Sequence, residues 1–165
     1  MINLASNNYL GLANHSRMNA AASRAAAELG AGSGAVRSIA GTMTIHEELE
    51  RRFAEFKHAE GALMFPSGFA ANSGTVAAIL DKEDVIVSDR LNHASIIDGA
   101  RLSRAEIKVF EHKDAEHADR LLAETKVSGR HQLLVTDGVF SMDGDIAPLP
   151  ELVEVAERHG AIMMV

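Results

Sequence analysis

Short apolar runs that alternate with helix-length segments constrain the fold of this chain more than any other feature of its sequence. Beyond Gly61 there are five such runs, at residues 62–65, 85–88, 107–110, 133–136 and 161–165. Strands that are apolar along their whole length and joined by helical crossovers are typical of a parallel sheet covered on both faces. The sequence therefore predicts an α/β fold with a mostly parallel sheet and helices on both of its faces.

Two helices are expected ahead of this sheet. An alanine-rich stretch over residues 17–29 stops at Gly30, a common way for a helix to end. Apolar residues recur at helical spacing over 44–57, and Thr44 with Glu47 matches a capping box at the start. The glycine-rich stretch between the two helices is expected to be a loop. A last helix is expected near the C-terminus, ahead of the final apolar run.

Charge and cysteine content exclude several classes of function. The formal net charge is −7 and the basic residues are dispersed, so the chain has no basic stripe for a phosphate backbone and no nucleic-acid partner is expected. The absence of cysteine excludes disulfides, thiolate metal sites and a cysteine nucleophile, and fits a cytoplasmic protein. No apolar run approaches the roughly 20 residues that a membrane helix needs, so no membrane partner is expected.

One histidine follows an apolar run directly. His93, in LNHASIIDG, comes after residues 85–88 and before a helix expected over 94–102, with Asn92 as its N-cap. Because open α/β sheets bind ligands at the carboxyl ends of their strands, His93 is a candidate site residue. The alternative, a histidine that only hydrogen-bonds the start of the helix, stays open. The other histidines show no metal-binding spacing and are expected at the surface; they are His15, His46, His58, His112, His117, His131 and His159.

Two further segments at strand ends carry glycine and hydroxyl groups. In FPSGFAAN, residues 65–72, Gly68 lies at an expected helix start, where free backbone N–H groups suit a phosphate; a capped turn without a ligand is an equal alternative. In TDGVFSMDGD, residues 136–145, Ser141 follows an apolar run, and the Asp-Gly pair indicates a tight turn. The aspartates there match no oxygen-ligand loop, so no metal is expected. The three strand ends together favour a ligand that carries a phosphate.

Five blocks of the sequence, taken together, resemble the α-oxoamine synthases, which are pyridoxal-phosphate (PLP) enzymes on the large-domain aminotransferase fold. The blocks follow the family's order over almost the whole chain: NNYLGL at 7–12, GAGSGAVRSIAGT at 30–42, SGFAAN at 67–72, SDRLNHASIIDG at 88–99 and TDGVFSMDGDIAPL at 136–149. The resemblance implies a PLP-binding large domain and a homodimer whose subunits share the active site.

The resemblance also implies roles for single residues. His93 corresponds to the imidazole that stacks on the pyridine ring of the cofactor and meets the substrate. The backbone N–H groups of Gly68 and Phe69 correspond to the pair that holds the cofactor phosphate. Ser141 corresponds to the serine that hydrogen-bonds the cofactor near its phenolic edge. Asn7 corresponds to the asparagine that contacts the amino-acid carboxylate.

The reaction that the resemblance implies is the condensation of an amino acid with an acyl-CoA thioester. Two members of the family fit the blocks. Asp137, where several 8-amino-7-oxononanoate synthases carry glutamate, favours a glycine C-acetyltransferase that joins glycine and acetyl-CoA into 2-amino-3-oxobutyrate. The alternative is 8-amino-7-oxononanoate synthase, which joins alanine and a pimeloyl thioester.

The chain ends at Val165 within its last apolar run, so we expect a sheet truncated part-way. Residues 1–60 are then an N-terminal helical segment with the glycine-rich loop, and residues 61–165 the first half of the PLP-binding domain. The family's aspartate, histidine and Schiff-base lysine are expected beyond Val165, which predicts that these 165 residues alone are inactive. An alternative of another class is a natural short protein that binds a phosphate ligand without catalysis.

Overall fold

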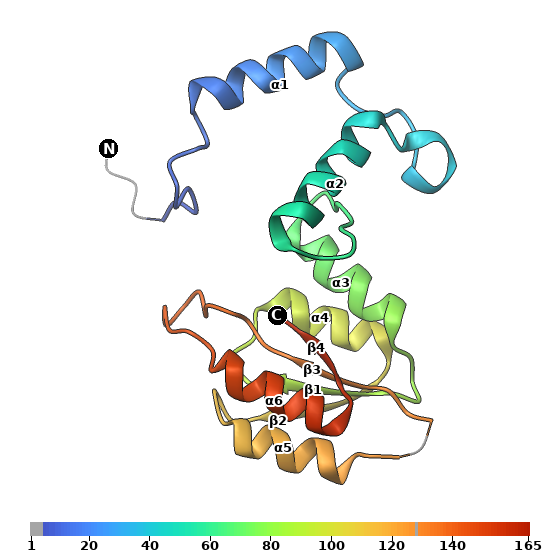
Figure 1. Cartoon of the computed structure of the whole chain (residues 1–165), viewed down its shortest axis with the longest axis vertical. Coiled ribbons are helices and arrows are strands. Elements are labelled where there is room, and N and C mark those ends of the chain that lie inside the picture. The colour runs from blue at the N-terminus through green and yellow to red at the C-terminus, as the bar shows by residue number, and fades with distance from the viewer. Residues whose placement is uncertain (1–4, 128) are drawn as a thin grey trace. The chain divides into compact units, whose positions relative to one another are not determined.

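The computed structural model describes residues 5–127 and 129–165, and the chain divides into two compact units, Met1–Met64 and Phe65–Val165. The first unit contains α1 (Ser16–Leu29), a single π-helical turn (Arg37–Gly41) and α2 (Thr44–Lys57) (Figure 1). The second unit contains α3 (Gly68–Ile79), β1 (Val85–Asp89), α4 (Ala94–Ser103), β2 (Glu106–Phe110), α5 (Ala115–Glu124), β3 (Gln132–Val135), α6 (Leu149–His159) and β4 (Ile162–Met164). The assignment of residues 1–60 and 61–165 to a helical segment and a PLP-binding domain stays a prediction.

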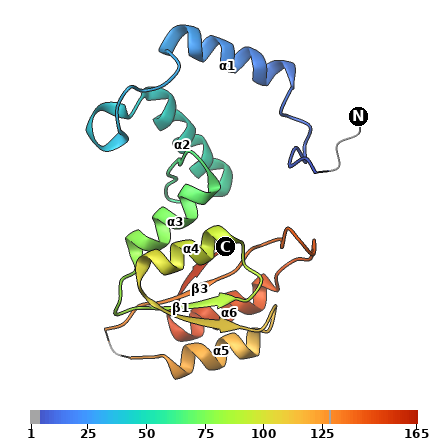
Figure 2. The ribbon, with the colours of Figure 1, turned by 180° about the vertical axis from the view of Figure 1, so that it is seen from behind.

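A parallel sheet forms the centre of the second unit. Its strand order is β2-β1-β3-β4, and each neighbouring pair is parallel. Helices α3 and α4 cover one face of the sheet, and α5 and α6 cover the other (Figures 1 and 2). The predicted α/β fold, with a parallel sheet between helices, is confirmed.

The alternation of side chains along β1 explains why its first three residues are all apolar. Val85 and Val87 point to the face where Leu122 of α5 and Leu152 of α6 pack. Ile86 points the other way, into the cluster formed with α3 and α4. Because both faces of a central parallel strand are covered, no position along it is left for a solvated side chain.

The prediction of a strand at residues 62–65 is wrong. The structure assigns no strand to this segment, and Leu63 is exposed. The N–H of Met64 donates to the carboxylate of Glu50 at 2.8 Å, so a side chain takes the place that a neighbouring strand would fill. A short apolar run has strand periodicity whether or not a partner strand is present, which is why periodicity alone overestimated the sheet.

Glu50 organises the end of the first unit. Its carboxylate pairs with the Arg37 guanidinium, from the π-helical turn, as well as with the Met64 N–H. The hydrogen bond from Arg37, followed by the one from Met64, lowers the pKa of Glu50 to about 2. One side chain of α2 therefore fixes two segments that have no regular partner of their own.

Helix ends agree with the sequence except at their caps. Helix α1 is confirmed with its stop at Gly30, and the last expected helix is confirmed as α6, which has a proline in its first turn. The loop expected over 31–42 contains the π-helical turn. The capping box was expected at Thr44 and Glu47 but lies one residue earlier, at Met43 and His46. Nδ1 of His46 accepts from the N–H of Met43 at 3.1 Å, and Thr44 is already helical. Among the described residues, no helix is long and apolar enough to cross a membrane.

Candidate functional site at the carboxyl ends of β1 and β3

The chain leaves two neighbouring strands in opposite directions. From β1 it continues into α4, on the α3 side of the sheet, and from β3 it continues toward α6, on the α5 side. Such a divergence opens a crevice at the carboxyl ends of the two strands, and ligands of open α/β sheets bind there. The loops after β1 and β3 carry His93 and Asp137, so the crevice is the candidate site.

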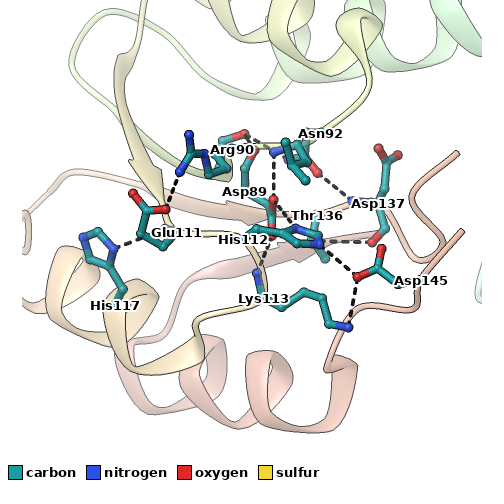
Figure 3. Close-up of polar contacts among 12 residues, drawn as sticks. Asp89, Arg90, Asn92, Glu111, His112, Lys113, His117, Thr136, Asp137 and Asp145 are labelled. Atoms are coloured by element: carbon teal, nitrogen blue, oxygen red, sulfur yellow. Dashed lines mark hydrogen bonds and ion pairs between the residues drawn. The ribbon is translucent and has the colours of Figure 1, made fainter. Parts of the chain in front are cut away.

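A reciprocal set of hydrogen bonds joins these two loops. The buried Asn92 amide donates to Ser88 Oγ and to the Val135 carbonyl, both at 2.9 Å, and its Oδ1 accepts from the Asp137 N–H at 2.7 Å. In return, Oδ2 of Asp137 accepts from the His93 N–H at 2.7 Å. Figure 3 shows Asn92 and Asp137 facing one another across the strand ends. The backbone of His93 is therefore fixed from the neighbouring strand.

His93, and not the expected Asn92, is the N-cap of α4. Its Nδ1 accepts from the Ser95 N–H at 3.2 Å and lies 2.7 Å from Ser95 Oγ. The side chain remains exposed at the crevice. The helix-start role and the ligand role, which the sequence left as alternatives, are compatible, because capping uses one ring nitrogen and leaves the rest of the ring accessible.

The start of α3 has the geometry of an anion site. Ser67 is the N-cap, and its Oγ accepts from the Ala70 N–H at 3.1 Å. The first helical residues, Gly68 and Phe69, have N–H groups with no carbonyl of the preceding turn to bind. A Cβ at Gly68 would meet nothing within 4 Å, so there is open space beside this backbone. The helix dipole adds positive potential at the same end.

Helix α3 is connected to the His93 cap through one side chain. The amide of Asn72 donates to Ser95 Oγ at 2.9 Å, and Ser95 is the residue that His93 contacts. Asn72, Ser95 and His93 thus form a continuous chain of hydrogen bonds. The predicted phosphate-binding helix and the predicted stacking histidine belong to one network.

Ser141 lies on a closed loop after β3. The Phe140 N–H donates to the Asp145 carbonyl at 2.9 Å, and the Gly144 N–H donates to the Phe140 carbonyl at 2.7 Å. Gly144 has φ of +76°, which confirms the tight turn expected from the Asp-Gly pair. Ser141 is exposed on this turn, on the connection that begins with Asp137. Its contact with a cofactor stays a prediction.

Asn7, the fifth predicted site residue, lies in the first unit. It is exposed, and its Oδ1 accepts from the Tyr9 hydroxyl at 3.4 Å. The structure therefore links α3, which begins with Gly68 and Phe69, to His93 through Asn72 and Ser95. It places Ser141 on the loop after β3, and Asn7 belongs to the first unit.

The expectation that the other histidines lie at the surface is wrong for His159, whose side chain is 12 % exposed, and for His112. Its side chain is 23 % exposed and lies between two carboxylates, with Nδ1 3.0 Å from Asp89 Oδ1 and Nε2 3.0 Å from Asp145 Oδ2. Its ring meets the Phe140 ring edge-on, with 4.4 Å between centroids. The signal in the sequence was its position: His112 follows β2 by two residues, so the strand-end rule used for His93 applied to it as well.

Charges around His112 shift two ionisation equilibria. Burial lowers the pKa of His112, but hydrogen bonds to Asp89 and Asp145 outweigh it, and the pKa is raised above its ordinary value of 6.5. The hydrogen bond from His112, followed by the one from Lys113, lowers the pKa of Asp145. Both shifts favour the charged forms. Within residues 5–127 and 129–165, no group of three or more histidine or acidic side chains is arranged to hold a metal ion.

A comparison with protein families decides where the chain belongs. The model of the aminotransferases of class I and II matches residues 1–165. The chain belongs to the aminotransferase class I and II family. The crevice at the ends of β1 and β3 is the candidate site of a member of this family.

Relatives within the family are named 8-amino-7-oxononanoate synthases. The 8-amino-7-oxononanoate synthase of Thermoanaerobacter pseudethanolicus is 59 % identical and synthase 1 of Bacillus subtilis 53 % identical, each over 100 % of this chain. The chain spans 42 % of the length of these curated relatives. They favour the 8-amino-7-oxononanoate synthase alternative over the glycine C-acetyltransferase that Asp137 had favoured.

Solved structures of two kinds of enzyme are similar to the chain, serine palmitoyltransferases and an 8-amino-7-oxononanoate synthase. Serine palmitoyltransferase of Sphingomonas wittichii superposes with a TM-score of 0.90 at 38 % identity, over 94 % of this chain and 39 % of that one. The S. paucimobilis enzyme, solved with a bound PLP–myriocin aldimine, gives 0.89 at 36 % identity over the same shares. An 8-amino-7-oxononanoate synthase of Francisella tularensis gives 0.78 at 28 % identity, over 94 % and 42 %. The resemblance to the α-oxoamine synthases is confirmed.

Proposed function

We propose that the full-length protein that carries these residues is a PLP-dependent 8-amino-7-oxononanoate synthase, which condenses alanine with a pimeloyl thioester. The observation that carries the proposal is the 59 % identity, over all 165 residues, to the synthase of that name from Thermoanaerobacter pseudethanolicus. The crevice between β1 and β3 supports it, because this is where the fold places a ligand.

The start of α3 fits the phosphate of PLP. Two free N–H groups, the dipole of a 12-residue helix and the space beside Gly68 suit a dianion that must approach the backbone closely. In this proposal Gly68 and Phe69 bind the phosphate, and the exposed ring of His93 fixes the plane of the pyridine. Bound PLP supplies a ring that accepts the electron pair released at the amino-acid Cα.

The remaining residues orient the reactants. Ser141 donates to the cofactor at its phenolic edge, and Asn7 binds the amino-acid carboxylate. The full-length protein is a cytoplasmic homodimer, and residues 61–165 are the first half of its PLP-binding domain. Its reactants are an amino acid and an acyl thioester; neither nucleic acid nor a membrane takes part.

A steady-state comparison tests the proposal. Purified full-length enzyme is assayed with alanine and pimeloyl-CoA and, separately, with glycine and acetyl-CoA. We expect the higher kcat/KM for the first pair. Glycine C-acetyltransferase is the second candidate because of the aspartate at position 137, and a preference for glycine and acetyl-CoA would establish it in place of our proposal.

A further inference from the structure

Four side chains join the ends of three segments at the edge of the candidate site. Asp89 ends β1, His112 and Lys113 follow β2, and Asp145 lies in the loop that carries Ser141. Figure 3 shows the His112 ring between Asp89 and Asp145, with the Lys113 ammonium beside the latter. None of these four side chains has a role in the proposed function.

The anchor of the cluster is Asp89, whose side chain is fully buried. Its carboxylate accepts from the Leu91 N–H at 2.8 Å and from the Lys113 N–H at 2.9 Å, in addition to its contact with His112. Asp89 therefore stays in place by bonds to backbone on both sides. The movable partner is Asp145, which belongs to the loop.

Asp145 is held to the rest of the unit through one oxygen. Its Oδ2 meets His112 Nε2 at 3.0 Å and Lys113 Nζ at 3.1 Å, whereas its Oδ1 is buried and has no hydrogen-bond partner among the described residues. A buried carboxylate oxygen without a partner is costly, so the position of Asp145 depends on its two cationic contacts.

The protonation state of His112 decides whether both of its contacts are hydrogen bonds. An imidazolium donates from both ring nitrogens, whereas neutral imidazole donates from one and presents a lone pair at the other. With a carboxylate 3.0 Å from each nitrogen, the neutral ring would place a lone pair against one of the two carboxylates. Only the charged ring satisfies both Asp89 and Asp145.

We propose that His112 is a positioning residue that, as an imidazolium, bridges Asp89 to Asp145 and so holds the loop of residues 138–147, with Ser141, against the end of β1. Loss of the ring proton breaks the bridge between the two carboxylates, leaves Lys113 as the remaining cationic contact of Asp145, and loosens the loop. The effect on the loop is independent of the proposed function. Its consequence for Ser141 and the cofactor rests on that function.

The charged groups around the ring support this assignment. Asp89 faces it from β1, Asp145 from the loop, and Lys113 from its own segment. Glu111 is engaged with Arg90 at 2.6 Å, and His117 of α5 accepts from the Glu111 N–H at 3.2 Å. The pKa of His112 is raised above 6.5, so the bridge is complete below that pH and is lost as the pH rises through the raised value.

Hydrogen exchange of the full-length protein, followed by mass spectrometry across pH, tests the proposal. The reporters are the loop N–H groups of Phe140, Gly144 and Ala147, which hydrogen-bond within the loop. Exchange at the His112 ring carbon gives the pKa of His112 in the same samples. After correction for intrinsic exchange, we expect loop protection to fall roughly tenfold as the pH passes that pKa, the scale of one lost charge-assisted hydrogen bond.

Variants separate a proton-dependent bridge from simple packing. We call the fall in loop protection at the His112 pKa the pH step. In His112→Gln, a neutral amide donates to one carboxylate only, so the loop should exchange roughly tenfold faster at pH 6 and show no pH step. Asp145→Asn keeps the shape of the side chain and should also remove the step. His159→Gln is the matched control, because His159 contacts Asp119 at 2.7 Å between α6 and α5, and it should keep the step. A wild-type step in both His112→Gln and Asp145→Asn would overturn the proposal.

An activity measurement distinguishes this inference from the proposed function. If the enzyme is an 8-amino-7-oxononanoate synthase, the alkaline limb of its kcat profile should follow the His112 pKa and flatten in His112→Gln. If alanine and pimeloyl-CoA are not its substrates, the exchange step still supports the bridge. If those substrates turn over and the step is absent, the bridge is wrong while the function stands.

Discussion

Asn92 shows how one buried amide can organise a strand end. It uses both of its polar atoms, and every partner lies on β1, on β3 or in the loop after β3. A shorter or apolar side chain would leave the Val135 carbonyl and the Asp137 N–H without this partner in a buried place. The precision of the candidate site thus depends on a residue that contacts no ligand in the proposed function.

Replacement of Asn92 by alanine should lower the free energy of unfolding by about 1–3 kcal/mol, the cost of leaving buried polar groups unpaired. Urea unfolding followed by circular dichroism measures the change. Asn19→Ala is the control, because the amide of Asn19 makes a hydrogen bond of similar length, 2.9 Å, at an exposed position. Equal losses in the two variants would show that the Asn92 network contributes nothing beyond an ordinary surface contact.

His93 combines a cap with its proposed contact to the cofactor, and two substitutions separate these roles. Asparagine is a good N-cap, so His93→Asn should keep the stability of the protein, whereas His93→Ala should lose up to about 1 kcal/mol. Both should lower kcat/KM roughly 100-fold, because the cofactor ring loses its orientation. Full activity in His93→Asn would show that only the cap matters.

At the scale of elements, α3 and α4 are in close contact through a residue without a side chain. A Cβ on Gly99 of α4 would lie 2.9 Å from the Asn72 carbonyl oxygen and 3.0 Å from Ser73 Cα, both on α3. The close approach of the two backbones brings Asn72 within reach of Ser95. The packing of two helices therefore determines whether the start of α3 and the His93 cap form one network.

A methyl group at Gly99 should separate these helices. We expect Gly99→Ala to destabilise the protein by about 1–3 kcal/mol, as overpacking does. Gly74→Ala on α3 is the control: its Cβ would meet Phe65 at 3.4 Å, an ordinary contact, and alanine favours a helix by up to about 1 kcal/mol. Thermal unfolding should therefore show a lower midpoint for the first variant than for the second.

The same elements show what a sequence can and cannot predict. Short apolar runs identified β1 to β4. Every residue of β1 and β3 is buried, whereas β2 and β4 are partly exposed and were found from their spacing between helices. The run at 62–65 is equally apolar but has no partner strand. Strand pairing depends on segments that are distant in the sequence, so a local pattern cannot predict it. Likewise, the position of His112 after β2 was visible, but its two carboxylates come from segments 23 and 33 residues away, so only the fold brings them together.

At the scale of the whole molecule, ionic contacts between segments set the response to pH. Hydrogen bonds from His159 and then Arg158 lower the pKa of Asp119, and those from His112 and then Lys113 lower the pKa of Asp145. These carboxylates stabilise the fold above their ordinary value of 3.8, and the contribution is lost as the pH falls through the lowered values. The contribution of His112 depends on pH in the opposite direction: it stabilises the fold below pH 6.5 and is lost as the pH rises through the raised pKa.

The two limits predict a range of greatest stability. Glu50, whose pKa is lowered from 4.5 to about 2, has the same sign as these two carboxylates, so all of these contributions are complete between pH 4.5 and 6.5. The urea midpoint should be highest in that range and decline on either side. Midpoints measured from pH 3 to 9 check this expectation. His112→Gln should flatten the alkaline decline and keep the acid one; an unchanged alkaline decline would assign it to another group.

The lysines of these 165 residues should not bind PLP covalently at one site. Lys113 pairs with Asp145, Lys108 with Glu106, and Lys126 donates to the His159 carbonyl, so these ammonium groups are engaged near the surface rather than desolvated in the crevice. Incubation of the 165-residue chain with PLP and borohydride, followed by peptide mapping, should give only scattered, substoichiometric labelling. One stoichiometric labelled lysine would contradict the expected inactivity of these residues alone.

The reciprocal bonds between the loops after β1 and β3 also bear on engineering. The Asn92 side chain accepts a hydrogen bond from the backbone of Asp137, and the Asp137 side chain accepts one from the backbone of His93. Neither loop is therefore a complete module. A chimera that takes only the loop after β3 from a relative with a longer side chain at position 137 would displace the His93 imidazole. A graft of both loops together would keep the hydrogen bonds that align them with each other.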